Sequence, residues 1–135
     1  MTIQLSVAVR NARLDAIETA IGASAILKIR SGSVPATCAT ADAGTVLATV
    51  NCPSDYLAAA SSGSKAKSGT WEDTSADATG TAAHFRLYAS DGATCHLQGT
   101  VTITGGGGDM TVDNTSFAAA QAFTITGFTL TDGNA

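Results

Sequence analysis

The chain has 135 residues, a formal net charge of −4 and a charged fraction of 13%, about half the roughly 25% of an average globular protein. This length suits one domain with a single core, and a hydrophobic content of 44% excludes a disordered chain. The acidic balance excludes nucleic-acid binding, which needs Lys and Arg to displace phosphate counterions, and no apolar run approaches the roughly 20 residues of a membrane span. We expect no signal peptide and synthesis in a cytoplasm, because no basic region followed by an apolar core opens the chain.

The composition predicts a surface that other subunits cover. Small domains rely on charge for solubility, whereas Ala, Thr, Ser and Gly take the place of charged residues in this chain. Flat, weakly charged surfaces of this kind are easiest to explain if neighbouring subunits lie against them. The alternative is a soluble domain with a Thr-rich sheet surface.

The N-terminal segment predicts an extended arm followed by a helix. Residues 1–5 are short and apolar, Ser6 is a suitable N-cap, and Gly22 is a suitable stop for a helix over 7–21. The apolar side chains fall on one helical stripe at spacings of three, four and seven: Val7, Leu14, Ile17 and Ile21. We therefore expect an arm and helix over 1–22 and a β-domain over 23–135. The helix packs either on its own sheet or on a neighbouring subunit.

The middle of the chain predicts short strands separated by loops. Strands are expected over 25–30 and 45–50, and the loop 31–44 between them is long enough for a crossover between two sheets. Trp71 is expected to anchor the core from a short strand. A turn or short helical segment is expected at 56–60, and a flexible loop at 61–69. The short strand that carries Trp71 is expected at 70–72, and a second loop at 73–80.

The stretch 84–130 carries the clearest strand pattern, because apolar residues recur at every second position between turn-forming segments. The residues expected to share a buried face are Phe85 with Leu87; Cys95, Leu97, Val101 and Ile103; and Met110 with Val112. In the last strand the phase changes at Gly127, which predicts a β-bulge. The four glycines at 105–108 predict a loose hairpin connection. Together these elements predict an all-β fold: an antiparallel β-sandwich, jelly-roll-like, with one N-terminal α-helix.

The three cysteines, Cys38, Cys52 and Cys95, predict free thiols in a reducing compartment. No pair has the spacing of a zinc site. Cys95 and His96 are neighbours on a strand, so their side chains diverge and do not chelate one ion together. A Cys38–Cys52 disulfide, formed once lysis exposes the protein to oxidants, is the alternative.

Residue types that carry catalysis are present without a recognisable arrangement. His84 and His96 are expected on the outward sides of their strands as surface histidines, with no third or fourth metal ligand in view. Glu72 and Asp73 are adjacent, so they diverge on a strand and do not form a carboxylate pair. We predict no catalytic, cofactor-binding or metal-binding residue and no enzymatic activity.

Two further motifs have a structural interpretation. The glycine run lacks the Gly-Lys-Ser/Thr ending of a phosphate loop and precedes Asp109 rather than a helix. Trp71, Tyr56 and Tyr88 could stack on a sugar, but with 5% aromatic residues in the chain they are expected to serve the core and its rim.

Several segments together resemble small virion proteins of tailed bacteriophages and prophages, and among these most closely capsid decoration or cement proteins. The resemblance lies in framework patterns and covers most of the chain, at 11–18, 85–92, 98–101, 108–115 and 121–130. It implies a β-sandwich or jelly-roll domain on the outside of the capsid, made in the bacterial host cytoplasm. The implied partners are the major capsid protein and further copies of the chain itself, as a dimer or trimer.

Two other functions remain open at this point. A tail or fibre component that binds the host surface would have a similar fold and few copies per virion. A small cell-wall hydrolase would need Glu72, Asp73 or His84. Neither a head nor a tail location follows from these patterns.

Overall fold

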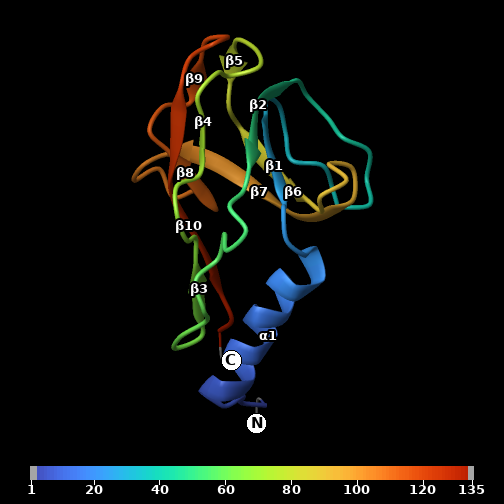
Figure 1. Cartoon of the computed structure of the whole chain (residues 1–135), viewed down its shortest axis with the longest axis vertical. Coiled ribbons are helices and arrows are strands. Elements are labelled where there is room, and N and C mark those ends of the chain that lie inside the picture. Colours follow the sequence, from blue (N-terminus) through green and yellow to red (C-terminus); the bar gives the residue numbers. More distant parts are fainter. Residues whose placement is uncertain (1–2, 134–135) are drawn as a thin grey trace.

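The computed structural model describes residues 3–133 as a mostly β protein with one N-terminal helix (Figure 1). The elements in chain order are α1 (Val7–Ile21), β1 (Ile26–Arg30), β2 (Val46–Asn51), β3 (Ser64–Ala66), β4 (Glu72–Asp73), β5 (Gly80–Thr81), β6 (His84–Tyr88), β7 (Cys95–Ile103), β8 (Met110–Val112), β9 (Ser116–Phe117) and β10 (Phe123–Thr131). No helix among residues 3–133 has the length and apolar character needed to cross a membrane.

Eight strands form one large open sheet in the order β2-β1-β6-β7-β8-β10-β3, and β4 also pairs with β10. A separate two-stranded sheet joins β5 to β9. The sheet is mixed, since β7 and β8 are parallel. The expectation of purely antiparallel pairing is therefore wrong at this one pair of strands.

The predicted helix is confirmed with both of its ends. The Ser6 hydroxyl accepts a hydrogen bond from the Val9 N–H, and Gly22, at φ 85°, donates its N–H to the Glu18 carbonyl. Glycine suits this position because a side chain disfavours positive φ. Leu14 and Ile21 are buried, so the helix packs on its own chain. In Figure 1 it extends from the sheet at the same end as β3, with its first turn farthest from β5 and β9.

All five residues of β6 are buried, which strand alternation alone does not predict. Phe85 and Leu87 face the core, as expected. His84, Arg86 and Tyr88 lie on the other face of the sheet, which we call the outer face, and loop 31–44 covers them. The expectation that His84 is a surface histidine is therefore wrong: its ring is 0% exposed.

A bulge in β7 changes the face on which Cys95 lies. Leu87 is paired with Leu97, but the next residue, Tyr88, is paired with Cys95, so His96 is an extra residue in β7. Paired residues on adjacent strands place their side chains on the same face. Cys95 therefore shares the outer face with Tyr88 rather than the core face with Leu97, against expectation. The bulge predicted near Gly127 is confirmed, at the register shift between Ile125 and Gly127.

The glycine run is not a hairpin connection. Val101 is paired with Met110 in parallel, so the chain returns across the end of β7 within residues 104–109, where parallel connections ordinarily need a dozen residues or more. Gly105 and Gly107 have positive φ, and a Cβ on Gly106 or Gly108 would collide with Thr102. The four glycines make this short crossover possible.

Four other expectations for the middle of the chain change. Loop 31–44 does not cross between two sheets, because the strands that it joins, β1 and β2, pair antiparallel in one sheet. Residues 56–60 contain no helix; Leu57 instead forms a β-bridge with Lys67. The expected flexible loop 61–69 contains β3, which pairs with the end of β10. The strand expected at 70–72 is shorter and begins two residues later, as β4.

The core lies between the inner face of the large sheet and the segments that fold over it. Trp71 is fully buried, as expected, with its ring centroid 6.3 Å from that of Tyr56 and 5.5 Å from that of Phe128. Phe117 of the small sheet stacks on Phe123 at 4.5 Å. Ile103, expected in the core, is 54% exposed; it is the last residue of β7, next to the glycine crossover.

Candidate functional site

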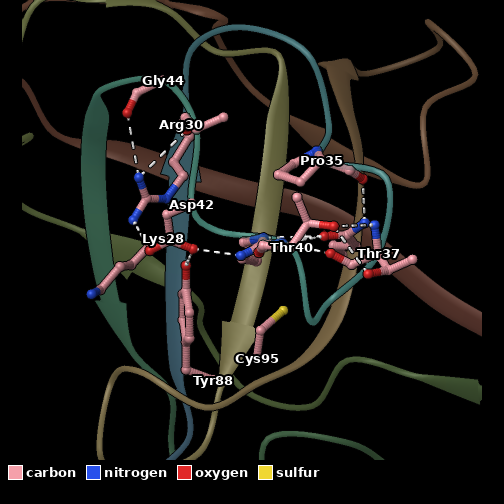
Figure 2. Close-up of polar contacts among 12 residues, drawn as sticks. Lys28, Arg30, Pro35, Thr37, Thr40, Asp42, Gly44, Tyr88 and Cys95 are labelled. Atoms are coloured by element: carbon pink, nitrogen blue, oxygen red, sulfur yellow. Dashed lines mark hydrogen bonds and ion pairs between the residues drawn. The ribbon is translucent and has the colours of Figure 1, made fainter.

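The densest polar arrangement among residues 3–133 lies on the outer face, under loop 31–44 (Figure 2). We call it the outer-face cluster: Arg30 of β1, Arg86 and Tyr88 of β6, Gln98 of β7 and Asp42 of the loop. The Asp42 carboxylate accepts hydrogen bonds from Arg86 Nη1 at 2.6 Å, Arg30 Nη2 at 2.6 Å and the Tyr88 hydroxyl at 2.7 Å. One loop carboxylate is thus held by three side chains of two adjacent strands.

Arg86 fastens the rest of the loop. Its Nη2 donates to the carbonyls of Thr37 at 2.8 Å and Thr40 at 2.9 Å, and its Nε donates to Gln98 Oε1 at 3.1 Å. Gln98 Nε2 in turn donates to the Pro35 carbonyl at 2.6 Å. All three nitrogens of this buried guanidinium are engaged within the protein. The cluster is therefore built to hold a loop in place rather than to bind an anion.

The charges of the cluster explain the pKa values of its members. Burial alone would raise the pKa of Asp42, but the hydrogen bonds from Tyr88 and Arg86 and the charges of Arg30 and Arg86 hold it below its usual range. Burial would lower the pKa of Arg86, and the hydrogen bond with Asp42 raises it instead. The loop is thus fixed by an ionised carboxylate between two cations.

His84 lies beside the cluster and is held neutral. Its Nδ1 donates to the Gly32 carbonyl at 2.8 Å, while its Nε2 and the Nε of Arg30 have no hydrogen-bond partner among residues 3–133. Burial lowers the pKa of the ring, and the charges of Arg30 and Arg86 act in the same direction. A proton on this ring is therefore disfavoured in the folded state.

A pH dependence follows from this histidine. The unfolded His84 binds a proton below about pH 6.5, whereas the folded ring binds one only at lower pH. We therefore expect the free energy of unfolding to fall as the pH drops from 6.5 toward the lowered folded pKa. In the His84→Gln variant this fall in the free energy of unfolding should be absent. Urea unfolding at pH 7 and pH 5.5 measures it, with His96→Gln, at an exposed position, as the matched control. An unchanged pH dependence in His84→Gln would contradict the assignment.

A second polar arrangement anchors α1. The buried Lys65 ammonium donates to Asp15 Oδ1 at 2.7 Å, to the Ala58 carbonyl at 2.8 Å and lies 2.9 Å from Glu18 Oε2. Burial would lower the pKa of Lys65, but the hydrogen bonds with Asp15 and Glu18 raise it. These residues line a cavity of about 490 Å³ between α1 and the segment 54–59. The three donors of the ammonium are already used, so the cavity presents no free cationic group.

The tip of α1 carries the main concentration of exposed apolar side chains. Among residues 3–133 four large apolar side chains are exposed, and three of them are Ile3, Val7 and Val9; the fourth is Ile103. Val7 and Val9 lie about 200° apart around the helix axis, so their joint exposure means that the first turn projects from the body. We call Ile3, Val7 and Val9 the helix tip.

The residues examined for catalysis are not brought together. Asp73 Oδ2 accepts from the Thr49 N–H and its Oδ1 from the Ser75 N–H, while Glu72 is exposed on β4. His84 is buried and His96 exposed. Within residues 3–133 no group of three or more His, Cys, Asp and Glu side chains is placed to hold a metal ion.

The three aromatic side chains that could stack on a sugar are all buried. Trp71, Tyr56 and Tyr88 are all 0% exposed. The Tyr56 hydroxyl donates to the Gly22 carbonyl at 3.2 Å, and the Trp71 Nε1 donates to the Ser68 carbonyl at 3.1 Å. None presents a ring face to a ligand. The outer-face cluster was missed because its residues are separated in sequence by loop 31–44 and two strands.

No family model, curated protein or solved structure matches this chain.

Proposed function

We propose that this protein decorates the outside of a bacteriophage capsid and stabilises the virion head by binding the major capsid protein. The observation that carries the proposal is the helix tip. Ile3 is 83% exposed, and Val7 and Val9 are each close to half exposed, at one end of a chain with only 13% charged residues. Apolar side chains gathered at a projecting end are typical of a surface that binds another protein.

The anchoring of α1 supports the same proposal. Lys65 and the buried Leu14 and Ile21 fix the helix on its own domain, so the helix tip is held out from the body in a defined position. A preorganised surface binds with little loss of conformational freedom. The helix then acts as a rigid projection toward the capsid shell.

Stabilisation of the head follows from selective binding. A protein that binds the expanded lattice, and not the separated subunits, shifts the equilibrium toward the lattice by mass action. A self-association face, giving a dimer or trimer at a symmetry axis, would multiply this contact. We also propose that the large mixed sheet and the β5-β9 sheet serve as the two layers of a jelly-roll-like β-sandwich; the stacking of Phe117 on Phe123 supports this layering.

The docking surface is tested by the double variant Val7→Ser, Val9→Ser. Both side chains are exposed on the helix tip, so the fold should be unaffected while the affinity for expanded capsids falls at least about tenfold. Sedimentation of capsids with bound protein measures the affinity. Ile103→Ser, which removes an equally exposed apolar side chain from β7, is the matched control. Unchanged binding by the double variant, or an equal loss in the control, would contradict docking through the helix tip.

The location in the virion is tested by copy number. Quantitative mass spectrometry of purified virions should find this chain at a ratio near one to the major capsid protein, or at a simple fraction of one. A handful of copies per particle would instead indicate a tail or fibre component that binds the host surface. Absence from particles would contradict both functions.

A further inference from the structure

Cys38 and Cys95 meet on the outer face, although neither their spacing nor the strand pattern predicts it. The bulge at His96 places Cys95 on the same face as Tyr88, and Figure 2 shows Cys95 beside the polar contacts of loop 31–44. Its thiol lies close enough to the thiol of Cys38, on that loop, for the two to interact. Both residues are partly accessible to solvent, and both are free thiols.

The position of Cys38 is fixed from both sides. Arg86 Nη2 holds the carbonyl of Thr37, the preceding residue, and that of Thr40, two residues later. Thr37 and Thr40 are further joined by a hydrogen bond between the Thr37 N–H and the Thr40 hydroxyl. The turn carrying Cys38 is thus held against β6 and β7 before any covalent bond forms.

Cys52 has a different environment. It is buried in the core, on the other side of the sheet from the outer face, and its backbone N–H donates to the carbonyl of Ala25, the residue before β1. Burial raises the pKa of its thiol to about 12, so a thiolate is scarcely populated at neutral pH. The structure therefore separates Cys52 from the pair on the outer face.

We propose that Cys38 and Cys95 are a redox pair, which a small-molecule disulfide such as oxidised glutathione converts into a disulfide that locks loop 31–44 onto β7. The pair stays reduced in a cytoplasm, where glutathione and thioredoxin keep thiols reduced, and closes when the protein reaches oxidising surroundings. This proposal does not depend on capsid binding.

The chemistry proceeds by two thiol–disulfide exchanges. Cys38 loses its proton and its sulfur attacks one sulfur of oxidised glutathione; the glutathione S–S bond breaks, and one glutathione leaves and takes up a proton. Cys95 then loses its proton and attacks the Cys38 sulfur, which releases the second glutathione. Two protein thiols are oxidised, and one glutathione disulfide is reduced to two glutathione molecules.

The order of these steps follows from the environment of Cys95. Burial and the hydrogen bond with Cys38 raise the pKa of the Cys95 thiol to about 12. Cys95 is therefore a poor first nucleophile and acts second, once the mixed disulfide on Cys38 lies next to it. Proximity compensates for its low thiolate fraction.

The test is peptide mapping of the full chain after incubation with oxidised glutathione at neutral pH. Remaining thiols are alkylated under denaturing conditions, and the protein is digested without reduction. Trypsin alone leaves Cys38 and Cys52 in one peptide, because no Lys or Arg lies between Arg30 and Lys65. A second protease that cleaves before aspartate separates them at Asp42.

The expected product is a peptide pair joined through Cys38 and Cys95, with Cys52 alkylated. Cys52→Ala should retain this cross-link, and Cys38→Ser and Cys95→Ser should each lose it. Closing a loop of roughly 60 residues should raise the Tm of the oxidised protein by about 10 °C, and dithiothreitol should reverse the increase. A Cys38–Cys52 cross-link, or glutathione retained on Cys38 with Cys95 alkylated, would overturn the proposal.

Discussion

Replacing Asp42 with Asn should lower the free energy of unfolding by about 2–3 kcal/mol. The neutral amide leaves two buried guanidinium groups, Arg30 and Arg86, without their shared counter-charge. The expected loss is below the roughly 3–5 kcal/mol of a fully buried pair, because the Asp42 side chain is 39% exposed and water screens part of the interaction. Urea unfolding at pH 7 measures the change.

The pH dependence provides an independent check on Asp42. Its pKa is lowered in the folded state, so its contribution is present above the unfolded pKa of about 3.9 and is lost as the pH falls through the folded value. The difference in the free energy of unfolding between the wild type and Asp42→Asn should therefore become smaller at acidic pH. Asp55→Asn removes an exposed carboxylate and is the matched control. Equal stability of Asp42→Asn and Asp55→Asn at pH 7 would show that the cluster does not hold the loop.

Trp71→Ala should be the most destabilising single substitution proposed here, with a loss of about 4 kcal/mol. The indole is fully buried between the rings of Tyr56 and Phe128, and its Nε1 satisfies the Ser68 carbonyl. Alanine would leave a cavity and an unsatisfied acceptor. Thermal and urea unfolding measure the loss.

Trp71→Phe is the matched control for the packing of this position. Phenylalanine fills most of the space and loses the hydrogen bond to Ser68, so we expect a loss of about 1–2 kcal/mol. If Trp71→Ala and Trp71→Phe were equally stable, the ring contacts with Tyr56 and Phe128 would not support the core.

The features predicted correctly from sequence are those with local causes. The helix from Val7 to Ile21 is fixed by Ser6 and Gly22, which supply caps within its own turns. A phase change in the apolar pattern predicts the bulge near Gly127. In each case the residues that decide the structure lie within a few positions of it.

The features that were missed depend on contacts between distant segments. His84 and Arg86 alternate like surface residues and are buried only because loop 31–44 folds over them. Neither a glycine nor a phase change in the apolar pattern marks the bulge at His96. Strand alternation therefore predicts the wrong face for Cys95. Strand β3 has a polar composition and forms because the end of β10 pairs with it.

The outer-face cluster and the helix tip differ in how far sequence could reveal them. Arg30, Asp42 and Arg86 come from three segments, and no local spacing marks them as partners. The helix tip could be predicted in part, because an apolar arm before a helix is a local feature of the sequence. The exposure of Val7 could not be predicted, because Val7 falls on the apolar stripe of the helix, which suits a buried face.

The pairing of β10 limits when the chain can fold during synthesis. This strand is the partner of β3, β4 and β8, so β3 and β4 lack their strand partner until residues 123–131 leave the ribosome, whereas β8 is able to pair with β7 earlier. Sheets assembled from such distant segments fold slowly and expose apolar strands in the meantime. Among the described strands, β2, β1, β6, β7 and β8 are able to pair with one another, and β5 with β9, before β10 is made. The eight-stranded sheet is therefore completed only after β10 has been made.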